Sequence, residues 1–348
     1  MMNIELVEKI ANAVLYEGYM LYPYRPTAVK NRQRFNFGSL YPKAYSEAQQ
    51  GTESWSMQTE CLMLAGQQTT LDVKVRFLHL VMREVCESEE GAEPAMKPVA
   101  ALEVDGQMFQ TWQEAIEREV PTKSFTLSEL TTEQQRTDFS FPSKQETELL
   151  RDSTDRLVGV IVRKQQAIEG SIEIEAERIA DGLFKITARI LNLTPMQSAT
   201  EASRDEALLG ALVSTHTILS VREGEFVSSL DPPDEFRDAV AHCNNVGTWP
   251  VLVGDEGERS VMLSSPIILY DYPQIAQESS GDLFDGTEID EILTLRIMTL
   301  TDEEKREMRS ADERARKILE RTETLPAEQL MKMHGAVRGL RPARKDRQ

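Results

Sequence analysis

Hydrophobic and polar side chains alternate over much of the chain between residues 34 and 192, and this alternation constrains the fold most strongly. It is clearest in SIEIEAERIADGLFKITARI, residues 171–190. Successive side chains of a β-strand point to opposite faces of the sheet, so a period of two predicts strands with one buried face. The sequence therefore predicts a β-rich core of antiparallel strands.

The same stretch predicts a hairpin with a defined register. A three-residue loop, Ala180-Asp181-Gly182, with Gly182 left-handed in a bulge, pairs Glu173 with Arg189 and collects the isoleucines on one face. A two-residue Asp181-Gly182 loop would pair Ile174 with Arg189 and mix the two faces. We therefore predict the longer loop.

Other segments are expected to form strands or helices. Alternation predicts strands in 54–64 (SWSMQTECLML) and 71–81 (LDVKVRFLHLV), with further strands at 99–105, 123–127, 156–163 and 216–222. WPVLVG (249–254) and SSPIILYDY (264–272) read as buried strands.

Helices are expected near both ends of the chain and in its middle. Apolar residues at helical spacing predict a helix over 4–16, and 199–213 is compatible with another. Asp231 and Pro232 are expected to cap and begin a helix with Phe236, Ala239, Val240 and Cys243 as its apolar stripe. Two capping-box patterns, Thr301 with Glu304 and Ser310 with Glu313, predict one helix or two over 302–322.

Together these elements predict an α+β protein with a sandwich-like, β-rich antiparallel core and a charged helical C-terminal region. We expect a core domain with a short N-terminal helix over 1–272, an acidic loop and helical region over 273–330, and a basic, disordered tail over 331–348.

Composition narrows the class of protein. The chain of 348 residues has a net charge of −19, which disfavours nucleic-acid binding because phosphate affinity is largely electrostatic. No run of apolar residues is long enough to span a membrane, and the N-terminus has no secretory pattern. Three widely spaced cysteines indicate reduced thiols, so we expect a cytoplasmic protein.

The segment from residue 19 to 46 contains no acidic residue but is rich in aromatic and basic ones. Tyr and Arg side chains are typical anchors of protein interfaces. This predicts a partner-binding surface made of Tyr22, Tyr24, Arg25, Arg32 and Arg34. Two alternatives are that the segment binds nucleic acid through stacking and phosphate contacts, or that it packs onto the acidic surface of the protein itself.

Candidate catalytic and metal-binding residues are few. His242 and Cys243 are the one His/Cys pair close in sequence and could supply metal ligands, but adjacent helical side chains point about 100° apart. Cys61 and His79 lie within apolar strand patterns and are expected in the core, and the acidic loop 282–291 does not match a calcium-binding pattern. No nucleotide-binding, zinc or esterase motif occurs, so we expect no cofactor.

Four long stretches stand out: YPYRPTAVKNRQRFNFGSLYP (22–42), SWSMQTECL (54–62), LDVKVRFLHL (71–80) and the stretch from LSSPIILYDY to TLTDEEK (263–305). They resemble an uncharacterised bacterial family encoded beside actinobacterial-type uptake [NiFe]-hydrogenases. The resemblance implies an accessory role in hydrogenase assembly or maturation and brings no catalytic residue with it.

We therefore expect a non-catalytic accessory factor that binds a partner protein, either a hydrogenase subunit or another maturation factor. One alternative is a hydrolase whose site is assembled from residues distant in sequence, such as His79, Cys61, His216 or His242. Another is a carbohydrate-binding or ligand-binding module in which Tyr22, Tyr24, Trp55 and Trp112 provide stacking surfaces.

Overall fold

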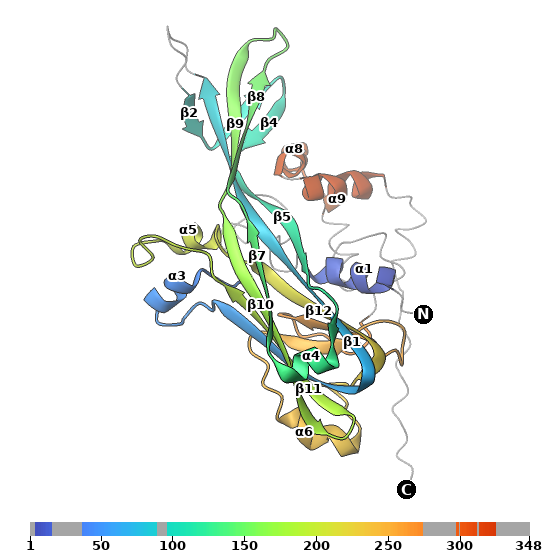
Figure 1. Ribbon diagram of the computed structural model, residues 1–348. Helices are drawn as coiled ribbons and strands as arrows, with labels where there is room; N and C mark the ends of the chain where they lie inside the picture. Colours follow the sequence, from blue (N-terminus) through green and yellow to red (C-terminus); the bar gives the residue numbers. More distant parts are fainter. Residues whose placement is uncertain are drawn as a thin grey trace.

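The fold is organised around one very long strand. The computed structural model describes residues 4–15, 37–88, 96–273, 297–298, 300–311 and 313–324. Strand β1 runs from Ser56 to Ser88, 33 residues, whereas strands in globular proteins usually have about five or six. It crosses an elongated molecule from a broad lower body to a narrow upper lobe (Figure 1). The two strands predicted over 54–64 and 71–81 are the two halves of this one element.

Both edges of β1 are paired over much of its length. Val75, for example, lies opposite Val120 on one edge and Thr217 on the other. Along one edge follow β11 (Leu183–Asn192), β6 (Phe125–Thr126), β5 (Trp112–Pro121) and β2 (Met96–Val99). Along the other edge follow β12 (Val213–Phe226) and β9 (Leu157–Gln165). Every one of these pairings is antiparallel.

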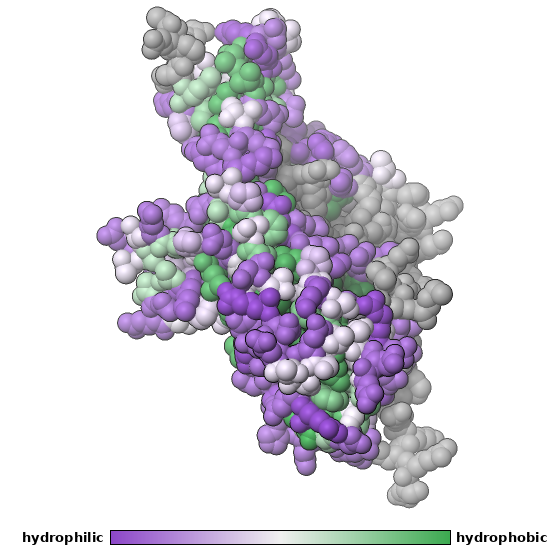
Figure 2. All heavy atoms as spheres, viewed as in Figure 1, coloured by the Kyte–Doolittle hydropathy of each residue, from purple (hydrophilic) through white to green (hydrophobic). Residues whose placement is uncertain are grey.

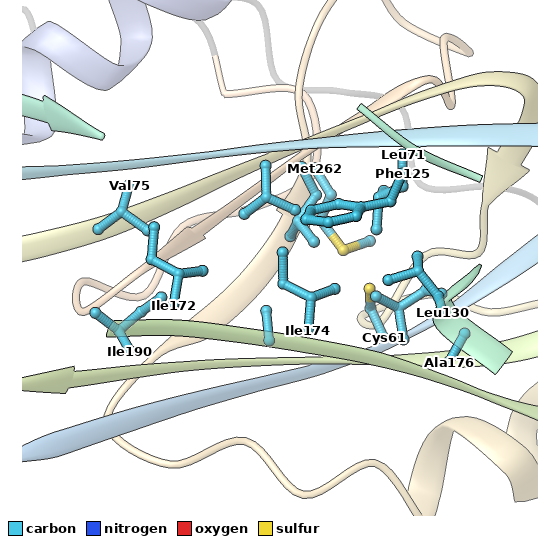
Figure 3. Close-up of a cluster of buried hydrophobic side chains, with 14 of the residues drawn as sticks. Cys61, Leu71, Val75, Phe125, Leu130, Ile172, Ile174, Ala176, Ile190 and Met262 are labelled. Atoms are coloured by element: carbon cyan, nitrogen blue, oxygen red, sulfur yellow. The ribbon is translucent and has the colours of Figure 1, made fainter. Parts of the chain in front are cut away.

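The sheet turns over onto itself and encloses the main core. Its order is β13-β14-β12-β1-β11-β10-β7, with β13 (Trp249–Leu252), β14 (Val261–Ser265), β10 (Ile168–Ala180) and β7 (Gln135–Phe141). Beside a register shift between Ala65 and Thr70, β1 bends back (Figure 1). Leu71 and Val75 on one layer then face Ile172 and Ile174 on the other (Figure 3). The β-rich antiparallel core is confirmed.

One long hairpin connects the body to the upper lobe. β7 continues into β8 (Lys144–Arg151), and β9 continues into β10. The register is unchanged across the junction, because Phe141 lies opposite Ile168 and Lys144 opposite Gln165. Pro142 at the junction cannot donate a ladder hydrogen bond, and the ladder is interrupted between Phe141 and Lys144. Its β9 half pairs with β1, whereas its β10 half pairs with β11.

The upper lobe has a small core of its own. It is built by the end of β1, by β2, β8 and β9, and by the separate pair β3 (Ala101–Val104) and β4 (Gln107–Gln110). Its buried side chains are Val85, Val104, Leu150 and Ile161.

Helix α1 (Ile4–Leu15) covers the outer face of the sheet, where Val7, Ile10, Ala11 and Val14 are buried against β12, β13 and β14. The short helices are α3 (Lys43–Ala48), α4 (Leu127–Thr132), α5 (Arg204–Leu208), η1 (Asp234–Phe236) and α6 (Arg237–Ala241).

The C-terminal stretch 302–322, predicted as one helix or two, contains two. They are α8 (Asp302–Ala311) and α9 (Glu313–Glu323). The Thr301 and Glu304 capping box forms, since each side chain accepts a hydrogen bond from the other residue's backbone N–H.

The predicted hairpin register is confirmed, but its tip differs. Glu173 lies opposite Arg189, and Gly182 has a φ of 70°. The ladder also pairs Ala180 with Leu183, so Asp181 and Gly182 alone form the loop, and the unpaired residue is Ile179. The Gly182 carbonyl accepts a hydrogen bond from Ala65 of β1 at 2.9 Å, a tertiary contact that local pairing rules could not include.

Two helix predictions were wrong in extent. Only Arg204–Leu208 of the stretch 199–213 is helical, and β12 already begins at Val213. The helical turn expected at Asp231 begins at Asp234 instead. A residue before proline is driven out of the helical region, and the consecutive Pro232 and Pro233 therefore delay the helix. Phe236, Ala239, Val240 and Cys243 still form the predicted apolar stripe.

The strand predicted over 264–272 is also wrong. Strand β14 ends at Ser265, and Pro266 follows it. Ile267 and Leu269 pack against the α1 side of the core, whereas Ile268 and Tyr270 are exposed. The strands predicted over 99–105 and 123–127 are shorter and shifted, at β2, β3 and β6.

Within the described ranges, no helix has the length and apolar character needed to cross a membrane. The acidic loop over 278–291 and the basic tail over 331–348 lie outside the described residues. The proposed domain boundaries remain predictions.

Candidate functional site

All five predicted partner-binding residues, Tyr22, Tyr24, Arg25, Arg32 and Arg34, lie outside the described residues. Only the end of the acid-free segment, residues 37–46, is described. Tyr41 and Tyr45 are buried there, and the Arg204 guanidinium lies 5.4 Å from the centre of the Tyr41 ring. Arg204 in turn pairs with Glu53 at 2.6 Å. This end of the segment packs onto the protein itself.

The residues considered for an enzyme site are not brought together. Cys61 and His79 face the main core side of β1, at different positions along it. His216 lies opposite Arg76, on the other face of the sheet. His242 is exposed at the end of α6. Within the described ranges no group of three or more His, Cys, Asp or Glu side chains is placed to hold a metal ion.

His242 and Cys243 do not converge, although α6 ends directly before them. His242 Nδ1 donates to the carbonyl of Asp238 at 2.6 Å, and Cys243 Sγ donates to the carbonyl of Ala239 at 3.8 Å. Burial raises the pKa of the Cys243 thiol to about 11 and also raises the pKa of Cys61. Both are therefore protonated at neutral pH and poor nucleophiles. All three cysteines are free thiols; Cys61 is buried as predicted, whereas Cys243 is only partly buried.

The two buried histidines are neutral. Burial lowers the pKa of His79 and of His216 to about 4. His79 Nε2 bonds to the carbonyl of Gln166 at 2.9 Å, and its Nδ1 accepts from Arg118 at 3.4 Å. With both ring nitrogens engaged, His79 has no lone pair left to act as a general base. It is the hydrogen-bonded core histidine that its position in the strand pattern predicts.

The aromatic residues of the carbohydrate-binding alternative are also separated. Trp55 directly precedes β1 and is covered by Lys43, whose Nζ lies 4.5 Å from the ring centre. Trp112 lies opposite Arg83, near the other end of β1. The structure does not assemble these two rings into one stacking surface.

Four exposed apolar side chains of the lower body lie on segments that meet at Asp271. One Asp271 carboxylate oxygen accepts from Ser228 Oγ at 2.5 Å, and the other accepts from the backbone N–H of Leu252 at 2.8 Å. The side chains on these segments are Leu230 (51% exposed), Trp249 (44%), Ile268 (72%) and Tyr270 (86%). We call these four residues the Asp271 patch. Asp271 thus ties together the three segments that carry these side chains.

Acidic residues dominate the loops around the patch. The exposed acids are Asp231, Asp234, Glu235, Asp238, Asp255 and Glu256. The nearby arginines are Arg237, which is already paired with Asp234 at 3.0 Å, and Arg259. We interpret these acids as the acidic rim of an apolar centre, an arrangement typical of protein interfaces.

Sequence reasoning missed the exposed half of this patch. Burial alternates along PIILYDY, with Ile268 and Tyr270 exposed. All four residues from Ile267 to Tyr270 are hydrophobic or aromatic, so the sequence pattern does not indicate which of them are exposed. Pro266, which ends the ladder, was the available signal.

Comparison of the sequence with protein-family models and with curated proteins gives no significant match.

Proposed function

We propose that this protein is a non-catalytic, cytoplasmic accessory factor that binds a partner protein through the Asp271 patch. The observation that carries the proposal is the exposure of Ile268 and Tyr270 on a segment anchored by its own neighbours, Ile267 and Leu269. Tyr combines a large apolar ring with a polar end and is enriched at interfaces for that reason.

The acidic rim specifies the chemistry of the partner. A basic surface bearing apolar side chains would be attracted to the rim during encounter and held by the apolar centre afterwards. The resemblance to proteins encoded beside [NiFe]-hydrogenases supports a hydrogenase subunit or a maturation factor as that partner. The three free thiols fit a reducing compartment.

The test is affinity purification of the tagged full chain from its native host, followed by mass spectrometry. We expect the wild-type protein to retain a hydrogenase subunit or maturation factor and the double variant Ile268→Ser/Tyr270→Ser to lose it. The matched control is Leu149→Ser/Met96→Ser, which removes two exposed side chains of the upper lobe, of 55% and 37% exposure.

Thermal melting of all three proteins completes the experiment. Because the substituted side chains are exposed, the melting temperatures should agree closely. Retention of the same partner by the patch variant would refute the proposed surface. Recovery of partners unrelated to hydrogenases would leave the surface in place and refute the hydrogenase assignment.

A further inference from the structure

Arg118 occupies an unusual position at the point where the long hairpin leaves β1. It lies on β5 opposite Phe77, whose side chain is in the main core. Its guanidinium carbon is 4.6 Å from the centre of the Phe141 ring, at the end of β7. Arg118 Nε donates to His79 Nδ1 at 3.4 Å, and Nη2 donates to Gln165 Oε1 at 2.9 Å.

Every one of these partners is uncharged. Gln165 and Phe141 carry no charge, and His79 is neutral because burial lowers its pKa to about 4. Within the described part of the chain, no carboxylate lies within ion-pair distance of Arg118. A half-buried guanidinium without a counter-ion is costly, and burial lowers the pKa of Arg118.

The neighbouring arginines show what is missing. Arg76 is paired with Glu117 and Glu119, at 3.2 and 3.0 Å. Arg83 and Arg163 share Glu114, each at 3.0 Å. These three arginines lie on the same part of the sheet and each has a carboxylate, so the lone cation at Arg118 is not a general property of this surface.

The guanidinium is also held in a fixed orientation. The ring of Phe141 covers one of its faces, and the bonds to His79 and Gln165 restrain two of its nitrogens. Neither hydrogen bond engages Nη1, so its donors face a ligand, and a planar, preoriented fork suits the two oxygens of a carboxylate. Ile116, two residues earlier on the same face of β5, is an apolar side chain that is 39% exposed.

We propose that Arg118 is the binding site for a carboxylate carried on a short apolar stem, with Arg118 as the anion-binding group and Ile116 and Phe141 as the apolar walls. The site is separate from the proposed function, because it shares no residue with the Asp271 patch. The net charge of −19 repels free anions at long range. Charges beyond about 8 Å are largely screened at physiological salt, so the local cation and the apolar contact decide binding.

The competing explanation is purely structural: Arg118 only secures the junction between β9 and β10. NMR of the wild-type full chain separates the two explanations. Propionate is titrated while the Nε–Hε signal of Arg118 and the methyl signals of Ile116 are followed, and chloride at equal ionic strength provides the reference. We expect saturable shifts of these signals with propionate and none with chloride. Equal responses to both salts, or no response to either, would overturn the proposal.

Variants then test the residue itself. Arg118→Gln should weaken propionate binding at least tenfold, whereas Arg136→Gln, an equal loss of charge at an exposed position of β7, should leave it unchanged. If both variants bound propionate equally weakly, the effect would be one of net charge, and the proposed site at Arg118 would be overturned. The titration of wild-type protein remains decisive if Arg118→Gln does not fold.

Two further ligands test which class of anion binds at Arg118 and which kind of molecule carries it. Inorganic phosphate binding more tightly than propionate would overturn the assignment to carboxylates. A blocked glutamate peptide binding more tightly than both propionate and its glutamine counterpart would support the site and identify the carboxylate as that of a protein.

Discussion

The main core of the body and the small core of the upper lobe are built on the same strand, yet they are stabilised differently. In the body, two layers of the folded sheet bury opposite rows of aliphatic side chains (Figure 3). In the upper lobe the buried cluster consists of Val85, Val104, Leu150 and Ile161 among the described residues. Hydrophobic stabilisation grows with buried apolar area, so the body should be the more stable part.

Between the two cores lies a belt of polar and charged side chains. It contains His79, Arg118 and Gln165 at the junction, and the ion-paired Arg83, Glu114, Arg163 and Glu148 above it. Figure 2 shows hydrophilic residues across this constriction, with hydrophobic residues above and below it. A β-strand can thus be continuous while the hydrophobic core along it is not, and the two cores can respond separately to mutation.

The largest effect is expected in the body. Ile174→Ala should reduce the free energy of unfolding by about 3–4 kcal/mol, because Ile174 is 1% exposed between the two layers and the change leaves a cavity. Urea unfolding followed by circular dichroism measures this. Ile179→Ala on the same hairpin is the control, since its 43% exposure predicts a change within about 0.5 kcal/mol. Similar losses in both variants would contradict the two-layer core.

The next effect concerns the boundary between the cores and depends on pH. The pKa of His79 is lowered to about 4 in the folded protein from an ordinary 6.5. The unfolded state therefore binds a proton first as pH falls, and the stability due to neutral His79 is present above pH 6.5 and lost between pH 6.5 and 4. Between pH 7 and pH 5 the free energy of unfolding should fall by about 2 kcal/mol less in His79→Gln than in the wild type. Unfolding measured at both pH values checks this, and an unchanged difference would contradict it.

A smaller and more local effect is expected in the belt. Glu114→Gln removes the carboxylate shared by Arg83 and Arg163. Because this network is partly exposed, we expect a loss of about 1–2 kcal/mol. Hydrogen exchange should show earlier opening of β8 and β9 than of β10 and β11. The control is Glu146→Gln, whose partner Lys144 is 64% exposed. Uniform acceleration throughout the sheet would show that the two cores unfold as one unit.

The smallest change in stability is expected in the acid-free segment. If Arg25 and Arg32 contribute to partner binding, changing both to Glu should weaken partner capture and leave the melting temperature close to that of the wild type. Melting and capture are measured on the same double variant. A lower melting temperature with unchanged capture would show instead that these residues pack onto the protein, as Tyr41 and Tyr45 do.

Local pattern predicted the parts of the fold that depend on near neighbours. The alternation correctly predicted the buried faces of β1, β10 and β11. Charge pairing correctly predicted that Glu173 lies opposite Arg189. The stripe of Val7, Ile10 and Val14 gave helix α1. The errors lie where a proline or a distant contact decides the outcome, as at Pro233, at Pro266 and at the Gly182 carbonyl bound by Ala65.

The candidate sites were largely beyond reach of the sequence. Ile268 and Tyr270 are exposed because the chain leaves the ladder after Ser265, and nothing in their own types distinguishes them from buried Val251 and Leu263. Arg118 stands out only because its neighbours in space, His79, Phe141 and Gln165, are all neutral. A charge is unpaired or paired according to what the fold places beside it.

The sequence by itself determined that this chain forms antiparallel strands with one buried face, because side-chain alternation is a local property of each strand. It also determined the net negative charge and the presence of three cysteines that belong to no metal-binding sequence motif. The tertiary structure alone decided that two predicted strands form one element of 33 residues and that this element contributes to several separate hydrophobic clusters. It alone also decided that Arg118 has no carboxylate partner among the described residues. These features arise from contacts between residues far apart in the chain, and spacing along the sequence does not record such contacts.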